Sequence, residues 1–183
     1  MRKLAIGAVF LALIPLSALA QDRPKAELFG GYSFLRTNDL VELNLNGWNA
    51  SMAANVNDWL GIAADFSGHY GKPSFFGFFP TSGLSTNVHS FLFGPRVTYR
   101  GHSNVIPFGH ALFGVSRGYA NIFGVNYSDS SFAMAFGGGV DFKLSDRVAI
   151  RMIQADYVQT RLASDRQNNA RLSAGIVFRI GSE

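Results

Sequence analysis

Three side chains with the chemistry of a hydrolase, Asp65, Ser67 and His69, stand at alternate positions in the sequence. Alternate residues of a β-strand share one face and lie about 7 Å apart at the backbone, so side-chain length alone would have to bring the Ser67 hydroxyl to the His69 ring. The sequence also offers no residue that we can name as the donor of an oxyanion hole. We therefore predict that these side chains are a polar lining and that the chain has no catalytic residue.

Metal and cofactor sites find no support in the sequence either. His110 has no Asp, Glu or second His at a spacing typical of metal ligands, and the chain has no cysteine. We expect His110 to be a hydrogen-bonding group, and we predict neither a metal site nor a bound cofactor.

A set of isolated charged side chains is the remaining candidate for function. Its members stand singly among apolar, Gly, Ala and Ser residues, and both signs occur in neighbouring segments. Such charges can pair with one another in a polar core, or they can line a narrow pathway for ions. The set comprises Glu27, Asp65, Arg96, Asp141, Lys143, Arg151, Asp156 and Arg171.

The start of the chain has the pattern of an export signal. A basic beginning and an apolar run over 4–16 precede the small-residue motif Ala-Leu-Ala at 18–20. The run is short for a helix that spans a membrane. We therefore expect residues 1–20 to be a signal peptide and residues 21–183 to form one domain.

Composition excludes two classes of protein. Without the two basic residues of the leader, the sequence has fourteen basic and twelve acidic residues, so nothing suggests a nucleic-acid partner. Hydrophobic residues make up 48% of the chain, yet after the leader no stretch approaches the roughly twenty apolar residues of a membrane helix. A helical membrane protein is therefore excluded.

Apolar residues alternate with small or polar ones over eight segments, which is the pattern of β-strands with two unlike faces. In the third segment, for example, Ile62, Ala64 and Phe66 alternate with Ala63 and Asp65. The segments are 26–35, 47–56, 61–70, 87–100, 107–117, 132–144, 147–158 and 171–180.

Long and short connections alternate between these segments, as is typical of an up-and-down barrel that crosses a membrane. In the seventh segment Arg151 and Asp156 fall on opposite parities, so we predict a β-bulge near 153–154 that lets both point inward. The expected short connections are 57–58, 101–106 and 145–146, and the longer ones are 36–42, 71–86, 118–130 and 159–169.

The two faces of the segments decide between a membrane barrel and a soluble β-sandwich. One face carries Phe, Leu, Ile, Val, Met and Tyr, whereas the other carries Gly, Ala, Ser, Asn and single charges, too small and mixed for an ordinary solvated surface. Lipid outside and a narrow polar interior explain both faces. We predict an all-β fold, an eight-stranded antiparallel up-and-down transmembrane β-barrel. Its lumen would be filled by ion pairs, first Asp65 with Arg96 and then Asp141 with Arg151.

Five short motifs in these segments resemble the outer-membrane β-barrel family that includes the transmembrane domain of OmpA and the small barrel OmpX. They are GGYSF at 30–34, WLG at 59–61, GPR at 94–96, GGGVD at 137–141 and GIVFRI at 175–180. The resemblance implies a protein of the outer membrane of a Gram-negative-type bacterium, surrounded by outer-membrane lipids. It also implies that the barrel-assembly machinery reads the last motif, although the sequence ends in Gly-Ser-Glu rather than in the family's Phe.

Four phenylalanines in the expected loop 71–86, Phe75, Phe76, Phe78 and Phe79, would form an unusual apolar patch in water. They could fold over the barrel mouth, lie at the lipid interface or contact an extracellular ligand. We predict a structural or surface-interaction role of an adhesion-like kind. A narrow porin for ions or small solutes is the alternative, and a lipid-modifying enzyme of the outer membrane is a more distant one.

Overall fold

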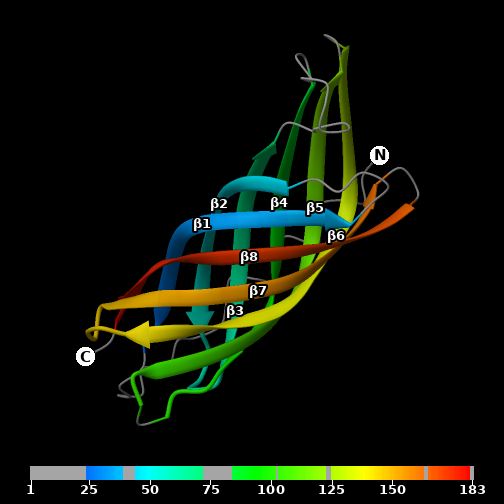
Figure 1. Cartoon of the computed structure of the whole chain (residues 1–183). Coiled ribbons are helices and arrows are strands. Elements are labelled where there is room, and N and C mark those ends of the chain that lie inside the picture. Colours follow the sequence, from blue (N-terminus) through cyan, green and yellow to red (C-terminus); the bar gives the residue numbers. More distant parts are fainter. Residues whose placement is uncertain are drawn as a thin grey trace, which may run out of the picture.

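The computed structural model describes residues 24–38, 44–71, 84–101, 103–122, 125–162 and 165–181 (Figure 1). The predicted signal peptide and the predicted contact residues Phe75, Phe76, Phe78 and Phe79 lie outside these ranges. Within them, no helix is long and apolar enough to cross a membrane. The strands are β1 (Ala26–Asn38), β2 (Asn44–Asn55), β3 (Leu60–Gly71), β4 (Leu84–Thr98), β5 (Val105–Ile122), β6 (Val125–Lys143), β7 (Val148–Leu162) and β8 (Asp165–Ile180).

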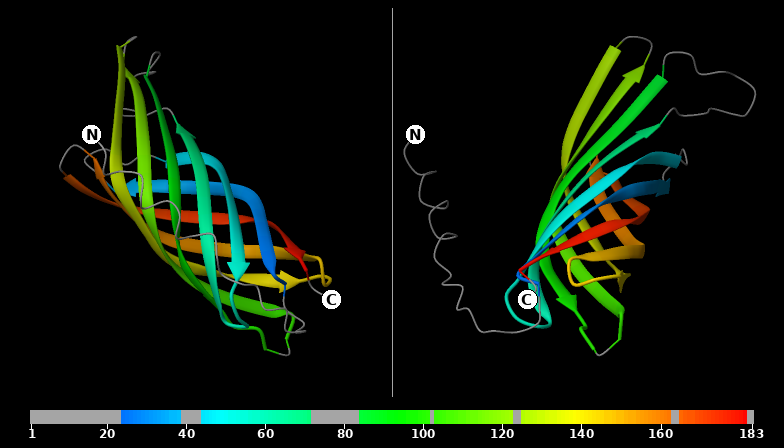
Figure 2. Two further views of the ribbon diagram at one scale, coloured as in Figure 1. Left: turned by 180° about the vertical axis from the view of Figure 1, so that it is seen from behind. Right: turned by 90° about the vertical axis from the view of Figure 1, so that its left-hand side faces the viewer.

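The strands form a closed barrel. Each strand pairs in antiparallel fashion with its neighbours in the chain, and β8 returns to pair with β1. The predicted eight-stranded antiparallel up-and-down barrel is therefore confirmed. Figure 2 shows the tilt of the strands from two further sides. We call the end with the β2–β3, β4–β5 and β6–β7 connections the turn end and the opposite end the loop end. The Lys25 amide donates to the Ile180 carbonyl at the turn end, over 2.8 Å.

The outer face of the barrel is apolar, as lipid contact requires. Phe93 on β4 is 65% exposed and Phe178 on β8 is 54% exposed. Together with their apolar neighbours they form a continuous apolar surface that is unusual on a protein face in contact with water. Other large apolar side chains exposed on this face are Leu28, Met52, Ile62, Phe66, Phe91, Phe113, Val115, Phe132, Phe136, Ile150 and Ile176.

Two tyrosines, Tyr70 and Tyr157, stand on the outer face nearer the loop end. The Tyr157 hydroxyl donates to Asn168 Oδ1 over 2.7 Å, and the Tyr70 hydroxyl lies 3.2 Å from His89 Nε2. A ring that is apolar along its body and polar at its tip suits the boundary between a membrane and water. This boundary therefore lies below the ends of the longest strands.

A bulge in β7 resets its alternation. The register of β7 against β8 shifts between Arg151 and Gln154. Met152 and Ile153 consequently both lie on the outer face, while Arg151 and Asp156 are both buried inside. The predicted bulge is confirmed, and its reason is electrostatic, since a regular strand would have placed one of these two charges against lipid.

Two of the predicted loops are wrong. Residues 118–130 and 159–169 were expected to be loops, but β5 continues to Ile122, β6 begins at Val125, β7 continues to Leu162 and β8 begins at Asp165. The apolar alternation that predicts strands ends where the outer face leaves the lipid. Backbone pairing between two adjacent strands does not need that alternation, so the hairpins extend further than the pattern.

The seam between β1 and β8 depends on two glycines that face each other, Gly31 and Gly175. A Cβ on Gly31 would collide with the carbonyl of Ala174, and one on Gly175 would collide with the carbonyl of Gly30. The strands that close the barrel can approach each other here because neither residue has a side chain.

Candidate functional site

Five charged side chains form a cluster inside the turn end, which we call the turn-end cluster: Glu27, Arg96, Arg100, Asp141 and Arg151. Arg96 bridges the two carboxylates, with Nη1 2.8 Å from Glu27 Oε2 and Nη2 3.3 Å from Asp141 Oδ2. Arg151 donates to Asp141 from Nε over 2.7 Å and from Nη2 over 3.0 Å. Arg100 donates to Glu27 Oε1 over 2.9 Å. The cluster thus joins β1, the end of β4, β6 and β7 across the lumen.

Two aromatic rings fill the space between these ions. The guanidinium carbon of Arg151 lies 4.2 Å from the centroids of both Phe29 and Phe108. Arg96 lies at the same distance, 4.2 Å, from the Phe108 ring. Stacking a weakly hydrated guanidinium on an aromatic face is favourable, especially away from water. Guanidinium groups and aromatic rings therefore alternate across the turn-end cluster.

A second group, the mid-barrel cluster, surrounds Arg171 on β8. Its Nη2 donates to Asp156 over 2.7 Å and its Nη1 donates to Asp65 over 2.7 Å and to the Ser67 hydroxyl over 3.2 Å. His110 Nε2 lies 2.8 Å from the other oxygen of Asp156. Arg171 is only 2% exposed, so its charge is balanced by protein groups rather than by water.

Gln154 links the two clusters. Its side-chain oxygen accepts a hydrogen bond from Arg151 over 2.7 Å, and its side-chain nitrogen donates to Asp156 over 2.8 Å. A continuous network of hydrogen bonds and ion pairs therefore runs from Glu27 at the turn end to Asp65 at mid-barrel. A cavity between the clusters, lined by Arg96, His110 and Gln154 among others, measures only about 10 Å³.

The structure changes one predicted ion pair. Asp65 contacts Arg171 instead of Arg96, because strand register places Arg96 beside Gly61, four residues closer to the turn end than Asp65. Four residues along a strand span about 13 Å, too far for a direct pair. Asp141 does contact Arg151, the second pair that the sequence predicts.

Lys143 lies apart from the lumen charges with which the sequence groups it. Its Nζ is 2.6 Å from Asp146 in the β6–β7 turn, and its side chain is 35% exposed. The hydrogen bond and positive charge of Lys143 hold the pKa of the Asp146 carboxyl below its ordinary value. Alternation assigned Lys143 to the correct face but could not show that it lies beyond the enclosed part of the lumen.

The residues with hydrolase chemistry meet other partners. Asp65, Ser67 and His69 are all buried in the lumen. His69 Nε2 lies 2.9 Å from the hydroxyl of Ser33 on β1, not from Ser67, and its Nδ1 has no hydrogen-bond partner. A Ser-His pair whose second ring nitrogen contacts no carboxylate lacks the group that would orient the base.

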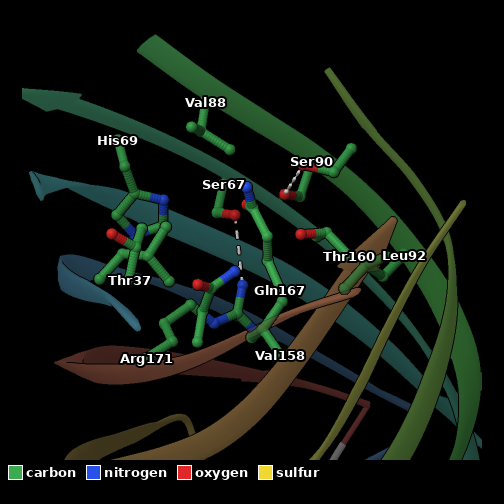
Figure 3. A pocket seen from close by; sticks show the side chains of 13 residues that line it. Thr37, Ser67, His69, Val88, Ser90, Leu92, Val158, Thr160, Gln167 and Arg171 are labelled. Atoms are coloured by element: carbon green, nitrogen blue, oxygen red, sulfur yellow. Dashed lines mark hydrogen bonds between the residues drawn. The ribbon is translucent and has the colours of Figure 1, made fainter. Parts of the chain in front are cut away.

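A small cavity lies at the loop end of the lumen (Figure 3). Its volume is about 30 Å³, which suits a few water molecules and nothing larger. Seven of its thirteen lining residues carry a hydroxyl or an amide group and four are aliphatic, and the Ser90 and Ser116 hydroxyls are hydrogen-bonded to each other over 3.1 Å. This loop-end cavity is lined by Leu35, Thr37, Ser67, His69, Val88, Ser90, Leu92, Ser116, Val158, Thr160, Gln167, Asn169 and Arg171.

Four residues that complete the network were not among the sites predicted from the sequence: Phe29, Phe108, Gln154 and Asn49. Phe29 shares the parity of Glu27, so the alternation already contained the signal that its ring points inward. Asn49, which donates to Asp65 over 2.8 Å, could have been found the same way. Phe108 and Gln154 could not have been found from alternation. The alternation is weak around Phe108, and the β-bulge lies just before Gln154. Over the described residues, no group of three or more His, Asp or Glu could hold a metal ion.

Comparisons with known proteins agree on the architecture. A family model described as outer membrane protein beta-barrel domain matches residues 6–178. No curated protein sequence matches the chain significantly. Among solved structures, Ail, the attachment invasion locus protein of Yersinia pestis, is 21% identical with a TM-score of 0.57, over 85% of this chain and 99% of Ail. Neisserial surface protein A is 15% identical with a TM-score of 0.66, over 85% of this chain and 97% of that protein. OprG of Pseudomonas aeruginosa is 10% identical with a TM-score of 0.55, over 88% of this chain and 98% of OprG.

Proposed function

Because the chain belongs to the outer membrane protein beta-barrel domain family, we propose that it is a closed barrel with a structural role that also presents its longest hairpin to ligands outside the cell. It is an integral protein of the outer membrane of a Gram-negative-type bacterium. Lipid surrounds its apolar face, and the turn end, with its short connections, faces the periplasm.

The filled lumen is the observation that carries the structural half of this proposal. The turn-end and mid-barrel clusters join strands from all sides of the barrel through charge-assisted hydrogen bonds of 2.7 to 3.3 Å. A lumen of eight strands has about the width of its own side chains. Conduction of solutes would require this network to open, so the porin alternative has less support than a closed barrel.

The β5–β6 hairpin supports the surface half. β5 has 18 residues and β6 has 19, against 12 each for β2 and β3. Their backbones remain paired out to Ile122 and Val125, so the hairpin projects beyond the rest of the rim (Figure 1). Holding a paired hairpin in order beyond the membrane boundary costs conformational entropy, and this part of the hairpin does not fill the lumen. Contact with a ligand would explain why the hairpin is so long.

A sulfated saccharide is a reasonable first probe for this hairpin, because Ail has been solved in complex with the heparin analogue sucrose octasulfate. Residues 120–127 would be replaced by Asn-Gly, which joins the paired residues Tyr119 and Ser128 through a tight turn. We expect cells that display the intact protein to adhere to a heparin-coated surface and cells with the shortened hairpin to lose that adhesion.

The control for this experiment is the change in gel migration on heating, which should be the same for both forms because a closed barrel resists cold detergent. Adhesion of the intact form no stronger than that of cells without the protein would contradict the surface half of the proposal. Equal adhesion by both forms would move the ligand site away from the β5–β6 hairpin.

The proposal has two further parts, one on assembly and one on catalysis. The barrel-assembly machinery would read the last strand, where Ile176, Phe178 and Ile180 all face outward. No catalysis is proposed, and the contact of His69 with Ser33 rather than with a carboxylate supports that view. A phospholipase assay on the refolded protein tests it, with lipid cleavage above that of a His69→Ala variant as the contrary result.

A further inference from the structure

The turn end of the lumen carries more positive than negative charge. In the part of the chain that the structure describes, four guanidinium groups point into it, while just two carboxylates, those of Glu27 and Asp141, oppose them. Among the described residues, the exposed rim does not correct the imbalance, because it adds more basic than acidic side chains. The four cations are Arg96, Arg100, Arg151 and Arg179, and the rim adds Lys25, Lys143 and Arg147 against Asp58 and Asp146.

Arg179 is the cation whose hydrogen-bond donors this arrangement leaves least satisfied. Register places it opposite Glu27, but the two oxygens of Glu27 are taken by Arg96 at 2.8 Å and by Arg100 at 2.9 Å. Arg179 is only 7% exposed, and its Nε and Nη1 have no hydrogen-bond partner. Leaving a buried charged donor unpaired costs far more than leaving one in water.

Other unpaired donors lie in the same region. Nε of Arg96 and Nε of Arg100 are also buried without a hydrogen-bond partner, and repulsion from Arg100 partly offsets the attraction of Arg179 to Glu27. The planar fork of a guanidinium matches the oxygens of a tetrahedral oxyanion, which it can bind through two parallel hydrogen bonds. One anion could therefore satisfy donors and offset charge at the same time.

We propose that the turn end of the lumen is a binding site for a small oxyanion of the phosphate class, with Arg179 as its principal ligand and Arg100 beside it. The opening faces the periplasm, so the phosphate can come from solution or from a phospholipid headgroup that reaches over the rim. The mid-barrel cluster offers no such site, because Arg171 is satisfied by Asp65 and Asp156.

The test uses the refolded protein in a maltoside detergent that contains no phosphate. Inorganic phosphate is titrated by calorimetry, with sodium chloride at equal ionic strength as the control for screening. We expect saturable binding of phosphate that is about tenfold weaker in Arg179→Gln and intermediate in Arg179→Lys, which keeps the charge but loses the fork. Arg147→Gln, which removes an exposed cation from the same rim, should bind like the unmodified protein.

A second measurement keeps the proposal open to refutation if the affinity is low. Without phosphate, Arg179→Gln should unfold at the same or a higher temperature than the unmodified protein, because it removes an unpaired charge. Adding phosphate, or exchanging the detergent for vesicles of phosphatidylglycerol, should then stabilise the unmodified protein and not the variant. Whichever of the two conditions stabilises the protein identifies the source of the phosphate group. The proposal is overturned if neither additive stabilises the unmodified protein more than chloride does, or if Arg179→Gln responds equally.

Discussion

The two halves of the lumen solve the same packing problem with different chemistry. The turn-end half encloses guanidinium groups between carboxylates and the rings of Phe29 and Phe108. The loop-end half holds hydroxyls and amides around a cavity of about 30 Å³. There the buried atoms Thr160 Oγ1 and Asn169 Oδ1 have no protein partner.

The difference follows from what each kind of group can tolerate. An ion in a confined space needs an opposite charge and directed hydrogen bonds, so ions impose one arrangement on the strands around them. A hydroxyl can share its hydrogen bonds with a few water molecules at little cost. The turn-end and mid-barrel clusters therefore close the lumen, and the groups around the loop-end cavity contribute only a modest share of the stability.

Removing Arg171 should have the largest effect, because it takes the guanidinium group away from two buried carboxylates, Asp65 and Asp156. We expect Arg171→Ala to lower the free energy of unfolding by about 3–5 kcal/mol. Urea unfolding of the protein refolded in lipid vesicles measures it. Ser90→Ala in the wall of the loop-end cavity is the matched control, with an expected loss of about 1 kcal/mol. Similar losses in the two variants would remove the distinction between the two halves.

A pair of double-mutant cycles compares the halves directly. Asp141 and Arg151 share two hydrogen bonds, whereas Ser90 and Ser116 share one at 3.1 Å. Alanine substitutions should reveal a coupling energy of about 1–3 kcal/mol for the first pair and about 0.5 kcal/mol or less for the second. Additive losses for Asp141 and Arg151 would mean that their contact does not contribute to stability.

Thr160→Val tests the loop-end half of the lumen by removing a hydroxyl instead of an ion. The Thr160 hydroxyl has no protein partner, so an apolar replacement of the same shape should leave the free energy of unfolding unchanged or raise it by up to about 1 kcal/mol. The same vesicle-based unfolding curve provides the readout. A clear loss of stability would show that this hydroxyl depends on an ordered hydrogen bond, and the loop end would then be as specific as the turn end.

The smallest effect is expected at the rim, where Lys143 lowers the pKa of Asp146 from its ordinary value of 3.8. A carboxyl with a lowered pKa in the folded state contributes stability above its unfolded pKa and loses it as the pH falls through the folded value. Asp146→Asn should therefore be slightly less stable than the unmodified protein at pH 7, and the difference should shrink as the pH falls below 3.8 and vanish once the carboxyl is protonated in the folded state. A difference that persists at lower pH would have a cause other than this ion pair.

The fold could be predicted from the sequence because a barrel wall has a period of two and its two faces meet different solvents. The bulge in β7 was predictable for the same reason, since Arg151 and Asp156 could not both avoid lipid without it. Hairpin ends could not be located, because β5 and β6 stay paired beyond the last apolar alternation.

Partners across the lumen were harder to predict than faces. Alternation assigns Asp65 and Arg171 to the interior, but they lie on β3 and β8 and meet only because the sheet closes. Height along the barrel also depends on register, which separates Arg96 from Asp65 and brings it to Glu27 and Asp141. The alternation within a single strand encodes neither the partner of a residue across the lumen nor its height along the barrel axis.

Electrical recording from the refolded protein in planar lipid bilayers tests the central claim most directly, because the claim is that interlocked ion pairs close the lumen. We expect no steady conductance from the unmodified protein in symmetric salt, at protein levels where gel migration shows that the barrel is folded. A large and steady conductance under these conditions would contradict the account and would favour the narrow porin instead.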